Sequence, residues 1–183
     1  MEVIELTIPA VKLITPRVFP DDRGLFMQSY HQDQYKEAGI DVSFVQDNRS
    51  RSSKGVLRGL HYQLEHAQDK LVSVIRGKIF DVAVDIRHGS PTFGEWVGEI
   101  LSDENHRQLF VPKGFAHGFL VLSDEVDLFY KCSDFYTPGD EYGIRWDDPQ
   151  LGIDWPFKDV LLSGKDKQQP ILSSVILDRL FAL

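Results

Sequence analysis

The sequence predicts an all-β protein, a sandwich or barrel of short strands, on three observations. Short runs rich in valine, isoleucine, leucine and aromatic residues recur along most of the chain. Turn-forming pairs such as Arg76-Gly77 and Pro138-Gly139 separate these runs. Helical periodicity is weak, and short strands joined by tight turns are typical of sandwiches and barrels.

In the first part of the chain, apolar runs between turn residues predict strands and one short helix. The predicted strands are Val3–Ile8, Val11–Ile14, Leu25–Tyr30, Val42–Gln46 and Ser50–Ser53. The third of them follows the turn sequence DRG. His31–Ala38 predicts two turns of helix because Gly39 supplies a stop signal.

Strands continue through the middle of the chain and then become rare. They are Val56–Gln63, Leu71–Ile75, Lys78–Ile86, Trp96–Leu101, Gln108–Val111, Gly118–Leu122 and Val126–Cys132. Val72 and Val74 show the alternation expected of a strand with one buried face. Beyond about residue 134 the pattern weakens, and only Val175–Leu183 predicts a further short helix.

The chain has 183 residues and no linker, low-complexity tract or repeat that would divide it. This length predicts one domain with a full-sized core. Within it we expect an N-terminal strand arm over about residues 1–15, a barrel over about 16–133 and a tail over about 134–183 that contributes to the site.

Composition excludes several classes of protein. The net charge of −8 argues against nucleic-acid binding, which needs a basic face. No apolar run is long enough for a transmembrane helix, and the N-terminus lacks the features of a signal peptide. The single cysteine, Cys132, cannot form an internal disulfide, which fits a reducing cytoplasm and a structural thiol.

The most informative segment runs from Gln46 to Lys70 and places polar side chains on strand-like sequence. Arg58 and His61 stand among leucines and a tyrosine, and Asn48 lies upstream. Burying such polar groups is costly unless something satisfies them. A polar ligand inside a β-barrel would do so, and the histidine and lysine indicate acid–base chemistry.

Common cofactor and nucleophile motifs are absent. The chain has no P-loop, no dinucleotide-binding glycine motif and no nucleophile elbow. CxxC and HExxH are missing as well, and no two histidines are spaced as HxH. We therefore predict neither a metal site nor a cofactor.

The stretch from Pro112 to His117 has the form PxGxxH, and this resembles the second cupin motif. The first cupin motif needs two closely spaced histidines and a glutamate, whereas here only His61 occupies that neighbourhood. The resemblance implies a cupin-type double-stranded β-helix, a jelly-roll barrel with a few short helices, that has lost its metal triad.

A longer series of motifs resembles one family, the dTDP-4-dehydrorhamnose 3,5-epimerases. The matching pieces are DRG at 22–24, QDN at 46–48, VLRGLHYQ at 56–63, KLVSVIRGKIFDVAVDIR at 70–87, VPKGFAHGFLVLS at 111–123, YKCSDFYTP at 130–138, WDDPQLGIDWP at 146–156 and SGKD at 163–166. They occur in the family's order over roughly residues 10–170. The resemblance implies cofactor-independent epimerisation at C3 and C5 of dTDP-4-dehydro-6-deoxy-D-glucose in dTDP-L-rhamnose biosynthesis.

Inverting a carbon next to a ketone needs a base on one face, an acid on the other and a cation near the ketone oxygen. His61 suits the base because an imidazole titrates near neutral pH. The resemblance implies Asp166 as the carboxylate behind it, Tyr130 as the proton donor and Lys70 as the partner of the enolate oxygen.

The resemblance also implies a set of substrate-binding residues. They are Arg23, Gln28, Gln46, Asp47, Asn48, Arg58, His117, Tyr136, Glu141 and Lys165. Tyr136 matches the aromatic residue that stacks on thymine, and Arg23 and Arg58 match the arginines of the nucleotide portion. Gln28 departs from the family's glutamate, so it keeps hydrogen bonding without the charge.

Strict strand alternation would place Arg58 and His61 on opposite faces, so we predict that Gly59 marks a bulge or twist that brings both inward. The loop WDDPQLGIDWP is interpreted as structural, packing Trp146 and Trp155. The family pattern implies a homodimer in which N-terminal strands pair.

Three alternatives stay open at this point. A mono-epimerase acting at C3 or C5 alone would use the same dyad. A sugar-nucleotide-binding cupin without turnover would keep the cavity but not the chemistry. A metal-dependent cupin oxygenase or isomerase would carry stoichiometric metal.

Overall fold

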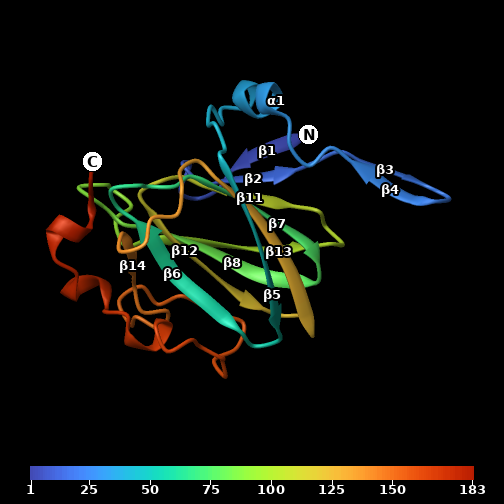
Figure 1. Ribbon diagram of the computed structural model, residues 1–183. Coiled ribbons are helices and arrows are strands. Elements are labelled where there is room, and N and C mark those ends of the chain that lie inside the picture. The colour runs from blue at the N-terminus through green and yellow to red at the C-terminus, as the bar shows by residue number, and fades with distance from the viewer.

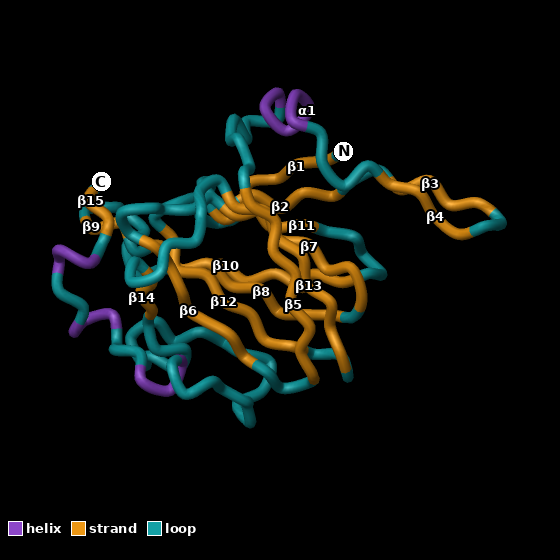
Figure 2. The backbone as a smooth tube through the Cα atoms, viewed as in Figure 1, coloured by secondary structure: helices purple, strands orange, loops and turns teal.

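Two antiparallel sheets face each other and form a jelly-roll barrel in the computed structural model, which describes residues 1–183 (Figures 1 and 2). The larger sheet has six strands, in spatial order β1 (Glu2–Glu5), β2 (Lys12–Thr15), β11 (Gln108–Val111), β7 (Lys70–Arg76), β13 (Glu125–Cys132) and β5 (Gln46–Ser53). The smaller has five, in the order β10 (Trp96–Ser102), β8 (Lys78–Asp85), β12 (Phe115–Val121), β6 (Leu57–Gln63) and β14 (Glu141–Gly143). The predicted all-β class is confirmed.

The remaining elements lie outside these sheets. They are the hairpin β3 (Val18–Asp21) with β4 (Gly24–Met27), the parallel pair β9 (Arg87–His88) with β15 (Phe181–Ala182), helix α1 (Gln32–Glu37) and 3-10 turns at Asp166–Gln168, Leu172–Ser174 and Leu177–Arg179. The β3–β4 hairpin projects away from the barrel (Figure 1). No helix is both long enough and apolar enough to cross a bilayer.

Apolar residues form cores on both sides of the five-stranded sheet. Between the two sheets lie buried side chains that include Val72, Val121 and Leu128. On the outer face, residues such as Leu60 and Trp155 are covered by the C-terminal segment. Trp155 donates its indole N–H to the Trp146 carbonyl at 2.9 Å, in accord with the structural role predicted for that loop.

Several element boundaries differ from prediction. Residues 42–45 are not strand, and the strand instead begins at Gln46 and continues to Ser53. The predicted strand Leu25–Tyr30 is half of a hairpin that begins at Val18. The C-terminal helix prediction was wrong, because Phe181 pairs with Arg87 in a strand and only Leu177–Arg179 turns.

Candidate active site

A cavity of about 510 Å³ lies between the two sheets. Each sheet contributes side chains to it, and the C-terminal segment closes one side. Its polar lining comprises Ser50, Arg58, His61, Lys70, His117, Tyr130, Glu141, Ser163 and Asp166. All four residues expected to catalyse, His61, Lys70, Tyr130 and Asp166, therefore meet in one cavity.

His61 and Asp166 form a hydrogen-bonded dyad. The His61 Nε2 lies 2.5 Å from Asp166 Oδ1, and Ser163 donates its hydroxyl to Asp166 Oδ2 at 2.7 Å. Burial raises the pKa of Asp166, but the hydrogen bonds from His61 and Ser163 outweigh it and hold the pKa below its usual value. The carboxylate therefore stays charged behind the imidazole and fixes its orientation, so that Nδ1, which lies 3.8 Å from Glu141 Oε1, is the nitrogen that can take a proton.

Tyr130 enters the cavity from β13, in the sheet opposite His61. Burial raises the pKa of its phenol, the electrostatic effects of Cys132 and Glu141 act in the same direction, and Arg58 acts against them. A raised pKa keeps the phenol protonated at neutral pH, as a proton donor requires.

Lys70 begins β7 and supplies an ammonium group to the same cavity. Burial lowers its pKa, because a charged amine is costly away from water. The electrostatic effects of Cys132, Asp81 and Glu141 work against this lowering. A cation held in such surroundings stabilises a developing oxyanion more strongly than one in water.

The predicted bulge at Gly59 is confirmed and explains how Arg58 and His61 share the cavity. His61 pairs with His117 across β6 and β12, whereas Arg58 pairs with Phe119, so the register shifts between the two pairs. Gly59 adopts a φ of +118°, and the Gly59–Leu60 peptide bond is cis. The extra residue turns Arg58 back to the cavity, where its Nε donates to Ser52 Oγ at 3.1 Å.

The segment that carries Tyr136 runs along the edge of the site. Gln46 accepts the Tyr136 backbone N–H at 2.9 Å and donates to Asn48 at 3.1 Å. The Tyr136 ring is half exposed, and its hydroxyl lies 3.4 Å from Glu141, which is ion-paired with Lys165. These residues thus lie together at one edge of the site, as the sequence led us to expect.

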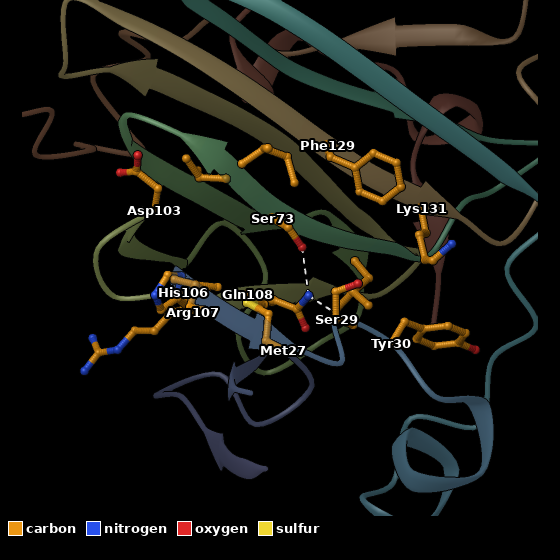
Figure 3. A pocket seen from close by; sticks show the side chains of 14 residues that line it. Met27, Ser29, Tyr30, Ser73, Asp103, His106, Arg107, Gln108, Phe129 and Lys131 are labelled. Atoms are coloured by element: carbon orange, nitrogen blue, oxygen red, sulfur yellow. Dashed lines mark hydrogen bonds between the residues drawn. The ribbon is translucent and has the colours of Figure 1, made fainter. Parts of the chain in front are cut away.

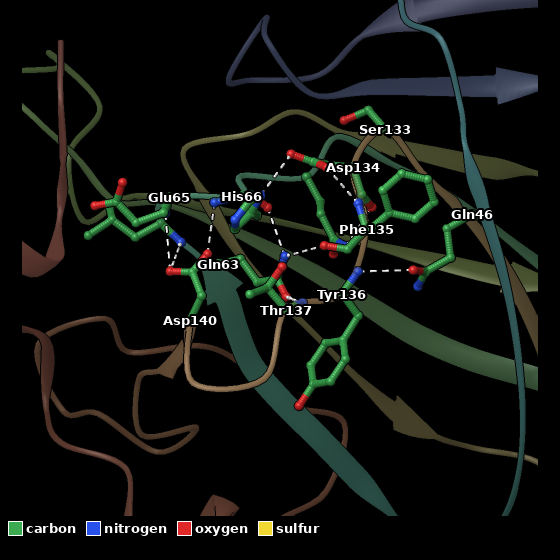
Figure 4. A network of polar contacts seen from close by, with 12 residues as sticks. Gln46, Gln63, Glu65, His66, Ser133, Asp134, Phe135, Tyr136, Thr137 and Asp140 are labelled. Atoms are coloured by element: carbon green, nitrogen blue, oxygen red, sulfur yellow. Dashed lines mark hydrogen bonds and ion pairs between the residues drawn. The ribbon is translucent and has the colours of Figure 1, made fainter.

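Two residues that sequence reasoning missed hold this segment in place (Figure 4). Asp140 accepts the backbone N–H groups of residues 64–66, at 3.2, 3.1 and 2.8 Å. Gln63 donates to the Phe135 carbonyl at 3.1 Å and accepts from Thr137 N–H at 2.8 Å. The sequence signals were the glutamine that ends a strand and the aspartate that follows a Pro-Gly turn.

Of the ten expected binding residues, Arg58, His117 and Glu141 line the cavity itself, and three others, Asp47, Arg23 and Gln28, lie away from both the cavity and its edge. Asp47 is on the opposite face of β5, because alternation along the strand turns it away from Gln46 and Asn48, and it accepts from Lys131 Nζ at 2.8 Å. Arg23 is at the tip of the β3–β4 hairpin and pairs with Asp21 at 2.6 Å. Gln28 follows β4 and lines a separate small pocket. The chain's own fold therefore does not bring these side chains to the dyad.

A second cavity, of about 550 Å³, lies on the other side of the six-stranded sheet (Figure 3). Met27, Ser29 and Tyr30 line it together with Phe129 and Lys131. Gln108 connects two segments that line this cavity, because its side-chain amide donates to Ser29 O and Ser73 Oγ, both at 2.9 Å. None of the four residues expected to catalyse lines this second cavity.

Nowhere in the chain are three or more His, Cys, Asp or Glu side chains grouped to hold a metal ion. His61 and Tyr130 instead approach one space from different sheets, with Lys70 beside them. A ring placed there would meet a base on one side and an acid on the other. Fold and cavity together define the class, a cupin-type isomerase that works by proton transfer.

Comparison with known proteins specifies the family within this class. The family model described as dTDP-4-dehydrorhamnose 3,5-epimerase matches residues 5–174. A Pseudomonas aeruginosa dTDP-4-dehydrorhamnose 3,5-epimerase is 59% identical over 170 residues, covering 92% of this chain and 94% of the relative. The chain belongs to the dTDP-4-dehydrorhamnose 3,5-epimerase family.

Solved structures agree in fold over nearly the whole chain. The Legionella pneumophila dTDP-6-deoxy-D-glucose-3,5-epimerase, in complex with dTDP-4-keto-L-rhamnose, superposes with a TM-score of 0.97 at 53% identity, covering 100% of this chain and 98% of that one. ChmJ of Streptomyces bikiniensis, a 3'-monoepimerase in complex with dTDP-quinovose, superposes at 0.90 with 34% identity, covering 97% and 91%.

Proposed function

We propose that this chain epimerises dTDP-4-dehydro-6-deoxy-D-glucose at C3 and C5 to give dTDP-4-dehydro-L-rhamnose. One observation carries the proposal: His61, Tyr130 and Lys70 line a single cavity, with Asp166 bonded behind the histidine. Similarity to 3,5-epimerases over 92% of the chain supports the choice of substrate.

In this mechanism His61 takes the proton from the carbon next to the C4 ketone. The electron pair moves onto the ketone oxygen, and the Lys70 ammonium stabilises the resulting enolate. Tyr130 then gives its proton to the opposite face of the same carbon. Exchange with solvent returns the imidazolium and the tyrosinate to their starting states, after which the second carbon is inverted in the same way.

Cations and amides around the cavity would hold the nucleotide end. Arg58 lies at its wall, and charge-assisted hydrogen bonds to phosphate are each worth roughly 1.5–3 kcal/mol. Tyr136 exposes a ring suited to stacking on thymine. The remaining contacts that we propose come from Gln46, Asn48, His117, Glu141 and Lys165.

The positions of Arg23 and Gln28 support a homodimer. Their hairpin extends beyond the barrel (Figure 1). It keeps Phe19, Leu25 and Phe26 exposed, although Phe19 and Phe26 lie against each other. In a two-fold dimer, the hairpin of one protomer would bring Arg23 to the cavity of the other.

The unpaired Cys132 fits a reducing cytoplasm as the site of this reaction.

Turnover in heavy water tests the proposed reaction. Each inversion passes through an enolate that is reprotonated from a solvent-exchanged group, so we expect deuterium at both C3 and C5 of the product by NMR. Label at one carbon only would instead make the protein a mono-epimerase, the activity described for ChmJ. If no label enters and the sugar nucleotide still binds, the protein is a binding cupin.

A further inference from the structure

Asp81 is a buried charge that the mechanism above does not use. It lies on β8, among apolar residues, and is fully buried. Its Oδ1 is 2.8 Å from His117 Nε2, whereas its Oδ2 is buried without any hydrogen-bond partner. An unpaired carboxylate oxygen in a protein interior costs free energy, so its retention calls for a reason.

His117 and His61 are register partners on adjacent strands, and both line the cavity. Each ring is held through Nε2 by its own buried aspartate, Asp166 for His61 and Asp81 for His117. Register partners present neighbouring side chains on one face of a sheet. The site therefore contains two imidazole–carboxylate pairs side by side.

The two pairs differ in how their carboxylates are compensated. Both oxygens of Asp166 have partners, in His61 and Ser163. Glu141, the other acid of the cavity, is paired with Lys165. Only Asp81 keeps a buried oxygen without a hydrogen-bond partner, and none of the close ion pairs of the cavity includes Lys70.

We propose that Asp81 is a positioning residue of the reaction, a buried anion that orients His117 through one oxygen and holds the Lys70 ammonium protonated with its remaining charge. This inference rests on the proposed function, in which Lys70 meets the enolate oxygen. Asp81 is not among the residues that line the cavity, whereas its partner His117 is, so it acts through other groups and not on the substrate directly.

The surroundings of Lys70 fit this role. The titratable and charged groups facing it are Tyr130 and Cys132 on β13, Asp81 on β8, His117 on β12, Arg58 and His61 on β6 and Glu141 on β14. Its partner on β11, Val111, is apolar. Because Glu141 already has a cation and a buried thiol is neutral, Asp81 is the anion available to Lys70.

Asp81→Asn tests the proposal, because it keeps the size of the side chain and removes the charge. Losing the carboxylate behind a metal-bound histidine typically costs about 10- to 100-fold in activity, and we expect a loss of the same order here, in kcat rather than in KM. Without the anion the Lys70 amine loses its proton more readily, so the alkaline limb of kcat moves to lower pH by about one unit or more. Asp127→Asn is the matched control, since Asp127 is also buried but pairs with Arg49 and Arg51 away from the cavity.

A second readout follows Lys70 without turnover. Acetic anhydride reacts only with neutral amines, so the acetylation of Lys70 against pH, measured by peptide mass spectrometry, reports its protonation. We expect Asp81→Asn to shift this profile to lower pH and Asp127→Asn to leave it in place.

Wild-type kcat in Asp81→Asn, a change confined to KM, or an unmoved acetylation profile would each overturn the proposal. If the variant does not fold, the wild-type profile decides, because a Lys70 amine that is mostly neutral at pH 7 contradicts the role of Asp81. A wild-type protein that exchanges no deuterium would instead refute the proposed function while leaving the acetylation result interpretable.

Discussion

The neighbours of Tyr130 and His61 suit these side chains to the opposite halves of the proposed proton transfer. Burial raises the pKa of the Tyr130 phenol and keeps it protonated. The charged Asp166 carboxylate stabilises a proton on His61 once the ring has taken it. Neither side chain needs a metal or an organic group to perform its half of the transfer.

Tyr130→Phe should therefore lower epimerisation by about 100- to 10,000-fold, the usual contribution of one general acid. Because the phenyl ring preserves packing, the affinity for dTDP should change little. Steady-state kinetics and calorimetric titration with dTDP measure the two effects. Tyr142→Phe is the control, since Tyr142 stacks on Tyr62 outside this cavity and should retain activity. Near wild-type turnover in Tyr130→Phe would exclude it as the proton donor.

At the scale of elements, the bulge in β6 decides which side chains reach the cavity. A regular strand would direct Arg58 and His61 to opposite faces. Gly59 makes the irregularity possible because it adopts a positive φ and lies against β12. A Cβ at this position would come within 2.5 Å of the Gly118 Cα and 2.7 Å of the His117 carbonyl.

Gly59→Ala should thus be costly in both stability and activity. Overpacking of this kind typically costs about 1–3 kcal/mol, to which the unfavourable φ adds. We expect a lower Tm and a large loss of kcat, since His61 and His117 must separate. In Gly152→Ala, which has a φ of +58° but no neighbour closer than 4.0 Å, only a small loss of stability is expected. Equal Tm values for the two variants would show that the contact with β12 is unimportant.

At the scale of the whole molecule, the site draws on segments far apart in the chain. Lys70 and Tyr130 come from one sheet, His61 and His117 from the other, and Asp166 from the C-terminal segment. The β3–β4 hairpin, whose turn contains Arg23, in contrast extends away from the barrel (Figure 1). A site completed by a second copy of the chain accounts for both facts.

Mixing two inactive variants tests this arrangement. We expect Arg23→Ala and His61→Asn each to be impaired, and their co-refolded mixture to regain about a quarter of wild-type activity, since half of the dimers are mixed and each has one complete site. Activity of the mixture and its mass by light scattering are the measurements. If the mixture is dimeric by light scattering but regains no activity, the hairpin does not act in the partner's cavity.

Beyond Asp166, which followed from the family resemblance, the sequence by itself determined the all-β class, most strand positions and His61 as a candidate site residue. It did so because strand periodicity is local and because a polar segment such as 46–70 is costly in a core unless it serves a ligand. Gly59 could be identified as the site of a bulge, because strict alternation along the strand could not place both Arg58 and His61 inside the barrel.

Only the tertiary structure decided which of these residues face one another. The direction of Asp47 depends on the register of β5 against β13, and that of Arg23 on a hairpin that leaves the barrel. Asp81, Gln63 and Asp140 act through partners 36, 72 and 74 residues away, which no local pattern specifies. Such pairings depend on long-range contacts, because packing, and not local propensity, sets which residues of two strands face each other.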